Sequence, residues 1–103
     1  MIKVTILTPN EQGKKFDFEY YLNTHMPLVK QRLGPEGLIR TEEAKGISGP
    51  EPGSQAPYLV IAELFFESID AVHNAFTKHA HELMGDMPNY TDIQPQIQIN
   101  EII

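Results

Sequence analysis

Apolar and polar residues alternate along residues 2–8. Ile2, Val4 and Ile6 share one face of this segment, while polar side chains occupy much of the other. A period of two is typical of a strand with one buried face. We therefore expect the first element to be a half-buried strand, followed by a turn rich in polar residues.

The period changes to that of a helix from about Asp17 to about Leu33. Apolar, aromatic and imidazole side chains recur on one side of this segment, namely Phe18, Tyr21, Leu22, His25 and Val29. Pro27 lies inside the pattern, where its missing N–H and its effect on Met26 disfavour a regular helix. The pattern predicts an amphipathic helix with a kink, or two abutting helical pieces, just after His25.

Two further strands flank a loop in the middle of the chain. Charged residues are spread along 38–47, which is typical of a strand at a sheet edge. Glycine, proline and serine dominate 46–56 and predict a loop. Residues 58–66 are almost continuously apolar, which predicts a central strand covered on both faces.

The last part of the chain predicts a helix, a loop and a strand. Ser68 is a suitable N-cap for a helix that ends near Gly85, the polar stretch 86–92 reads as a loop, and 93–103 alternates as a strand. The order strand, helix, strand, strand, helix, strand predicts an α+β domain covering residues 1–103. In it, two helices pack on one face of a four-stranded antiparallel sheet.

The other face of this sheet has no helix left to cover it. Because the strand at 58–66 is apolar on both sides, an uncovered face would expose apolar side chains to water. We expect that face to pack against a second copy of the chain, giving a homodimer.

Composition narrows the possible functions. The chain has 103 residues, no cysteine and a net charge of −6, and its basic residues are scattered. Thiolate chemistry, disulfides and cysteine-ligated metals are excluded, and no nucleic-acid partner is expected. No apolar run approaches the roughly 20 residues of a membrane span, and no signal peptide is recognisable. We expect a cytoplasmic protein without membrane association.

His25 is the most informative single residue. It lies near the middle of the apolar stripe, so it should point towards the sheet. It is either a core histidine bonded to a neighbour or a general acid or base in a pocket. Tyr21 shares the stripe, where it either packs or donates a hydrogen bond to a substrate oxygen. Tyr20 is expected to point roughly the opposite way.

The remaining candidates lie in the second helix and the loop after it. His73, His79 and His81 have no pair spaced by four residues, so we expect no metal site. His79 flanks the apolar stripe, which favours a solvated or rim position, and ligand contact is the alternative. Tyr90, an aromatic residue in a polar loop, is expected to anchor that loop in a crevice.

Three segments together resemble the EthD family, named for a protein linked to bacterial ethyl tert-butyl ether degradation. They are 18–29 with its Tyr-Tyr-x-x-x-His-x-Pro-Leu element, 64–68, and 86–92 with Pro-Asn-Tyr-Thr-Asp. The resemblance implies a dimeric α+β barrel, in which ferredoxin-like protomers pair through their sheets. It also implies a ligand cleft between sheet and helices, with His25 at that cleft.

From these points we expect a homodimer that binds a small hydrophobic or aromatic metabolite. The concrete hypothesis is cofactor-free isomerisation or cyclisation, with His25 as acid or base and Tyr21, Tyr90 or His79 in contact with the substrate. An alternative is a non-catalytic ligand-binding partner of an oxygenase in ether or aromatic degradation, to which a generic oxidoreductase label would attach. A third is a structural dimer with His25 in its core, and haem binding is a weaker fourth option. We expect no cofactor.

Overall fold

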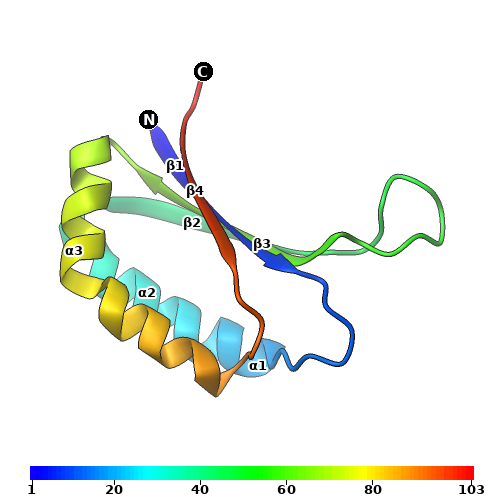
Figure 1. The fold of residues 1–103 in the computed structure, drawn as a ribbon. Coiled ribbons are helices and arrows are strands. Elements are labelled where there is room, and N and C mark those ends of the chain that lie inside the picture. The colour runs from blue at the N-terminus through cyan, green and yellow to red at the C-terminus, as the bar shows by residue number, and fades with distance from the viewer.

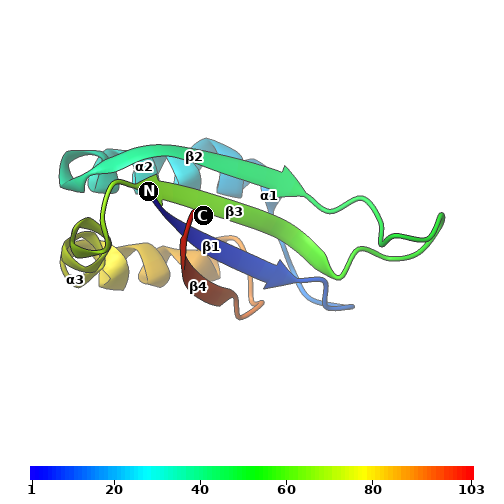
Figure 2. The same ribbon diagram turned by 90° about the horizontal axis from the view of Figure 1, so that it is seen from above.

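One four-stranded antiparallel sheet forms the frame of the computed structural model, which describes residues 1–103 (Figure 1). Its strands are β1 (Ile2–Pro9), β2 (Leu38–Lys45), β3 (Tyr58–Phe66) and β4 (Gln96–Glu101). They lie in the order β2-β3-β1-β4, so the charged strand β2 is an edge strand and the apolar strand β3 is central, as predicted. Figure 2 shows the sheet from above with the helices behind it.

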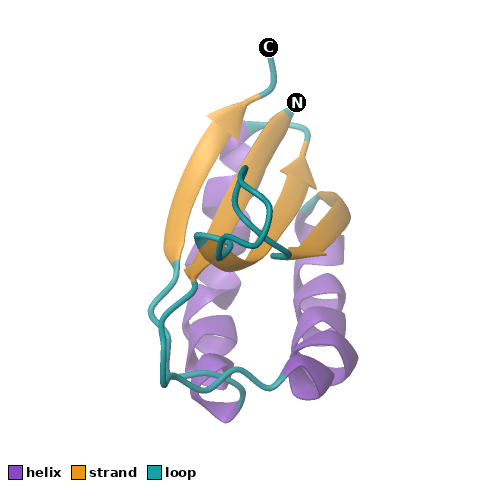
Figure 3. Cartoon of the chain, turned by 90° about the vertical axis from the view of Figure 1, so that its right-hand side faces the viewer, coloured by secondary structure: helices purple, strands orange, loops and turns teal.

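All the helices pack on one face of the sheet (Figure 3). The first helical segment consists of α1 (Phe18–Tyr20), a π-helical turn (Tyr21–His25) and α2 (Met26–Leu33), and the second is α3 (Ile69–Asp86). This order and pairing confirm the predicted α+β class and form the ferredoxin-like arrangement. None of these helices has both the length and the apolar character needed to cross a bilayer.

The π-turn is the structural form of the irregularity predicted near Pro27. The Met26 N–H donates to the carbonyl of Tyr21, five residues back, instead of to the carbonyl four residues back. Proline has no N–H to continue the regular pattern, and its ring would collide with the carbonyl four residues earlier. A widened turn just before Pro27 therefore replaces the expected kink.

The final strand is shorter than the predicted 93–103. It begins only at Gln96, because Pro95 has no N–H for the ladder. Ile93 is buried, and its N–H donates to Thr91 Oγ1 at 3.1 Å, so this residue anchors the loop instead of extending the strand.

The two faces of the sheet differ in what covers them. Val4, Leu64 and Phe66 point towards the helices and are buried in the core. Strand alternation places Ile61 and Phe65 on the opposite face, which has no helix over it. This face therefore carries two large apolar side chains, of which Ile61 is half-buried and Phe65 is buried beneath the Arg40 guanidinium, 3.8 Å from its ring centroid. An ion pair between Lys3 and Glu63 at 3.4 Å lies beside them.

Candidate functional site

A cavity of about 110 Å³ lies between the sheet and the two helical segments. Of the 17 residues that line it, 14 are hydrophobic, with Tyr21 and Tyr90 counted among them, so most of its wall offers a ligand only van der Waals contact. Its apolar walls include Ile6 from β1, Leu64 from β3, Val29 from α2, Leu83 from α3 and Ile97 from β4. Every layer of the fold thus contributes to one cavity, which is partly open to solvent.

Three predicted site residues meet in the wall of this cavity. The His25 and Tyr90 ring centroids lie 4.6 Å apart, those of Tyr21 and Tyr90 lie 5.3 Å apart, and all three side chains are buried. The hydroxyls of Tyr21 and Tyr90 have no hydrogen-bond partner within the chain, nor has Nε2 of His25, and none of these three atoms is fully sealed from solvent. The fold therefore gathers three polar groups without a partner in a mostly apolar cavity, which Thr8 also lines.

Burial keeps both phenols in their neutral form. It raises the pKa of Tyr21 and of Tyr90 far above the ordinary value, and the Glu43 carboxylate adds to the effect on Tyr21. Each hydroxyl therefore carries its proton at neutral pH and is able to donate a hydrogen bond to a ligand oxygen.

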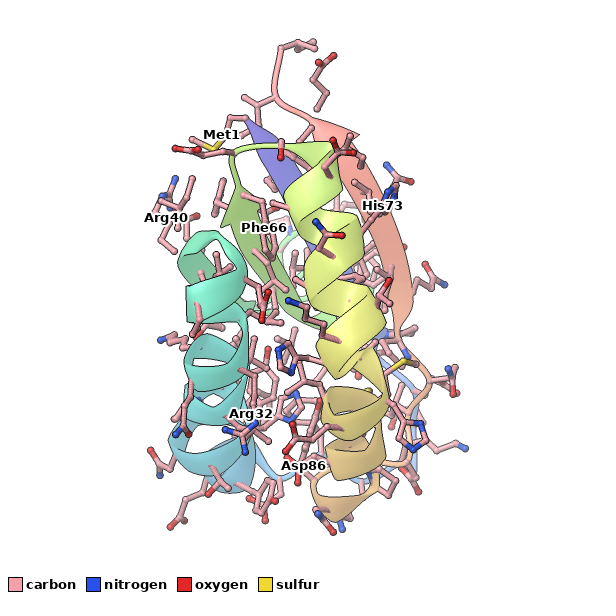
Figure 4. The ribbon with its side chains drawn as sticks, turned by 90° about the vertical axis from the view of Figure 1, so that its left-hand side faces the viewer. Met1, Arg32, Arg40, Phe66, His73 and Asp86 are labelled. Atoms are coloured by element: carbon pink, nitrogen blue, oxygen red, sulfur yellow. The ribbon has the colours of Figure 1, made fainter.

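The carboxylate of Asp86, the last residue of α3, lies next to the His25 ring on the side of Nδ1. Asp86 Oδ2 lies 2.9 Å from His25 Nδ1, and its Oδ1 accepts hydrogen bonds from Tyr20 Oη at 2.7 Å and Asn89 Nδ2 at 2.9 Å. Figure 4 shows Asp86 near the end of the gap between the two helical segments. This cluster joins α1, the π-turn, α3 and the turn after α3 at one point.

Sequence reasoning missed Tyr20 and Asp86, and the expected direction of Tyr20 was wrong. In an α-helix, residues turn by about 100° each, so Tyr20 and His25 would lie about 140° apart around the axis. The π-turn, which bonds each N–H to the fifth residue back, places residues five apart nearly above one another. Both side chains can therefore reach the same carboxylate. The available signal in the sequence was Pro27, whose place inside an amphipathic helix indicated that the helical period would be irregular there.

His79 lies away from these residues and does not line the cavity. Its Nε2 lies 3.2 Å from Glu36 Oε2, and Lys78 Nζ lies 3.1 Å from the other oxygen of that carboxylate. A second ion pair, between Arg32 and Glu82 at 2.9 Å, also connects α3 to the segment around α2. We therefore assign His79 to the contacts between helices.

We predict that acidification weakens the ion pairs and hydrogen bonds that Glu36, Glu82 and Asp86 form between the helical segments. Hydrogen bonds from Lys78 and Arg32 lower the pKa of Glu36 and Glu82, respectively. Burial raises the pKa of Asp86, but its three hydrogen bonds outweigh this and lower it. Because the unfolded carboxylates take up protons first, the stabilisation is full above about pH 4.5 and is lost as pH falls through the lowered folded-state values.

Urea unfolding measured from about pH 6 to about pH 2 checks this expectation. The free energy of unfolding should fall with pH, and less steeply in Glu82→Gln than in the unmodified chain. If the free energy of unfolding fell equally steeply in both proteins, the stabilising role given to the Arg32–Glu82 ion pair would be contradicted.

No group of three or more histidine, cysteine, aspartate or glutamate side chains is placed to hold a metal ion. The fold and the site together define a ferredoxin-like α+β protein with a small, mostly apolar ligand cavity. The family model described as the EthD domain matches residues 10–94. The chain belongs to the EthD family, within the dimeric α+β barrel fold family.

Solved structures agree with this assignment. An EthD-like protein from Ralstonia eutropha JMP134 is 35% identical over 99% of this chain and 91% of its own, with a TM-score of 0.93. An ethyl tert-butyl ether degradation (EthD) family protein from Bacillus halodurans C-125 is 19% identical over 100% of this chain and 99% of its own, with a TM-score of 0.78.

A more distant neighbour shares the fold alone. It is a dimeric protein with a ferredoxin-like fold from Bacteroides fragilis NCTC 9343, 12% identical over 98% of this chain and 95% of its own, with a TM-score of 0.52. No curated protein matches this chain closely enough to supply a functional parallel.

Proposed function

We propose that this protein binds a small, uncharged, hydrophobic or aromatic compound in the cavity and moves a proton on it, with His25 as the acid or base. One observation carries the proposal: the unpartnered groups of His25, Tyr21 and Tyr90 share a mostly apolar cavity. Because these three groups have no partner within the chain, each is free to form a hydrogen bond with an oxygen atom of a molecule bound in the cavity.

The chemistry follows from the unpartnered ring nitrogen of His25 and the two neutral phenols. Nε2 of His25 takes a proton from a carbon next to a carbonyl, and the C–H electron pair moves to make an enolate. Tyr21 or Tyr90 donates a hydrogen bond to the enolate oxygen as its negative charge develops. Where a C=C bond is conjugated with the enolate, return of the proton to the far carbon isomerises the compound. Where the enolate carbon attacks a second carbonyl, a C–C bond closes a ring, the carbonyl π electrons move to its oxygen, and the proton on Nε2 passes to that alkoxide. Neither route needs an oxidant.

The size of the cavity limits the ligand. An engineered apolar cavity of roughly 150 Å³ in another protein holds benzene, and the cavity here measures about 110 Å³. A compound built on one ring is therefore the expected size. Met26, Met84 and Met87 line the cavity, and their unbranched side chains are able to adjust to ligands of different shape.

Hydrogen exchange tests the proposal before the reaction is known. Small cyclic and aryl ketones are incubated with the protein in D₂O, and deuterium at the carbon next to the carbonyl is followed by mass spectrometry. Enzyme-dependent exchange is expected for at least one compound that fits the cavity. Binding without exchange across the panel would overturn proton transfer and support the alternative, a ligand-binding partner of an oxygenase.

We also propose that the uncovered sheet face pairs with a second copy. The apolar residues on this face support this, and so does the dimeric state of the Bacteroides fragilis neighbour. Sedimentation should give twice the chain mass of 11.7 kDa at micromolar concentration.

Ile61→Asp, on this face, is expected to weaken the dimer by about 100-fold, because a buried unpaired charge costs about 3 kcal/mol. Ile47→Asp, the same change at an exposed loop residue, should leave the mass unchanged. A monomeric unmodified chain would contradict the pairing.

A further inference from the structure

We propose that Asp86 is a positioning residue that holds His25 in one tautomer, with the proton on Nδ1 and the lone pair on Nε2. The inference rests on the proposed function for its catalytic meaning, but the tautomer itself is a property of the free protein. Asp86 lies on α3, 61 positions from His25 in the chain, and their atoms approach to 2.9 Å.

The carboxylate has the chemistry that the role needs. An ionised carboxylate only accepts hydrogen bonds, so the nitrogen facing it must carry a proton. Burial raises the pKa of Asp86, but hydrogen bonds from Tyr20, His25 and Asn89 outweigh this and lower it, so the group is ionised at neutral pH. In a neutral imidazole, a proton on Nδ1 leaves the lone pair on Nε2.

The carboxylate is also held in orientation. Tyr20 Oη and Asn89 Nδ2 both donate to Oδ1, at 2.7 and 2.9 Å, which leaves Oδ2 directed at the imidazole. The His25 ring in turn packs against Tyr90, with ring centroids 4.6 Å apart. Both partners of the bond are therefore fixed by contacts that do not involve a ligand.

This arrangement predicts what an isosteric amide would do. In Asp86→Asn, the donors from Tyr20 and Asn89 require the amide oxygen at the Oδ1 position, so the NH₂ group faces His25. Nδ1 must then accept, and the proton moves to Nε2. The base of the proposed reaction would be blocked while the shape of the site is retained.

Long-range ¹⁵N–¹H NMR of the imidazole ring, recorded with the ring neutral, reads the tautomer directly. The His25 signals are assigned by their loss in His25→Asn. The unmodified protein should show the Nδ1–H form, and Asp86→Asn should show the Nε2–H form. Asp70→Asn, which removes the same charge from an exposed position on the same helix, should leave the Nδ1–H form in place.

An Nε2–H tautomer in the unmodified protein would overturn the inference, as would an unchanged tautomer in a folded Asp86→Asn variant. If that variant does not fold, the measurement on the unmodified protein decides. Tyr20→Phe then serves as the second variant: it keeps the carboxylate and should retain the Nδ1–H form.

The exchange assay separates this inference from the proposed function. In Asp86→Asn, exchange should slow by about 10²-fold or more through kcat, with KM little changed. A tautomer switch in a protein that never exchanges its ligands would confirm Asp86 as the positioning residue and refute proton transfer. Full exchange activity after the switch would refute the catalytic role of the positioning.

Discussion

Replacing His25 with asparagine is expected to slow deuterium exchange by about 10²- to 10⁴-fold, the range over which a positioned general base contributes. The amide nitrogen of asparagine lies close to the place of Nδ1, so it is able to donate to Asp86 and preserve that contact. Nothing in asparagine replaces Nε2, the nitrogen left free for a ligand. The substitution therefore removes the base and keeps the hydrogen bond behind it.

His81→Asn is the matched control, because His81 is exposed on α3 and lies outside the cavity. This variant should catalyse deuterium exchange at the rate of the unmodified protein. Circular dichroism and sedimentation should show that both variants keep the fold and mass of the unmodified chain. Exchange that persists in folded His25→Asn would contradict a catalytic role for His25. A large drop in melting temperature would favour the third hypothesis, a histidine of the core.

The largest loss of stability is expected from Phe66→Ala, at about 3–5 kcal/mol of the free energy of unfolding. Phe66 has no exposed surface and lies in the core under the two helical segments (Figure 4). Its removal leaves a void that a rigid sheet on one side cannot fill. A domain of this kind has about 5–15 kcal/mol in total, so the variant should be marginal.

Urea unfolding followed by circular dichroism measures the loss of free energy of unfolding. If the slope of this free energy against urea concentration is the same in both proteins, the compactness of their folded and unfolded states is unchanged. Ile47→Ala, at a residue that is 94% exposed, should change stability by no more than about 0.5 kcal/mol. A loss below about 1 kcal/mol in Phe66→Ala would contradict its place in the packed core. Phe66 does not line the cavity, so the variant is not expected to lose ligand contacts.

Periodicity predicted the parts of this molecule that depend on one buried face. The alternation at residues 2–8 predicted a half-buried strand, the apolar run at 58–66 predicted a central strand, and the charges at 38–47 predicted an edge strand. The structure has strands at all three places, with β3 inside the sheet and β2 at its edge. These predictions were confirmed because each segment must bury its own apolar side chains away from water, and this leaves a periodic pattern within the segment itself. A side chain's exposure on a strand or helix is mostly decided by its neighbours within a few residues.

The candidate site was only partly predictable, because it depends on groups far apart in the chain. His25, Tyr21 and Tyr90 were found, since each is a polar or aromatic residue in an unexpected setting. Asp86 was not, because a carboxylate at the end of a helix is unremarkable until a histidine 61 positions earlier meets it. Tyr20 was misplaced because the regular 3.6-residue period was assumed through the π-turn.

The π-turn also explains how the site accommodates one additional residue in the chain. It holds one more residue than the same stretch of α-helix would, since its N–H groups reach back five positions instead of four. Deletion of a single residue within it would allow ordinary α-helical winding and leave Tyr20 and His25 four positions apart, about 40° around the axis, so both side chains would still face Asp86. The π-turn is thus the form in which the helix accommodates one additional residue while the side chains before and after it keep a common face.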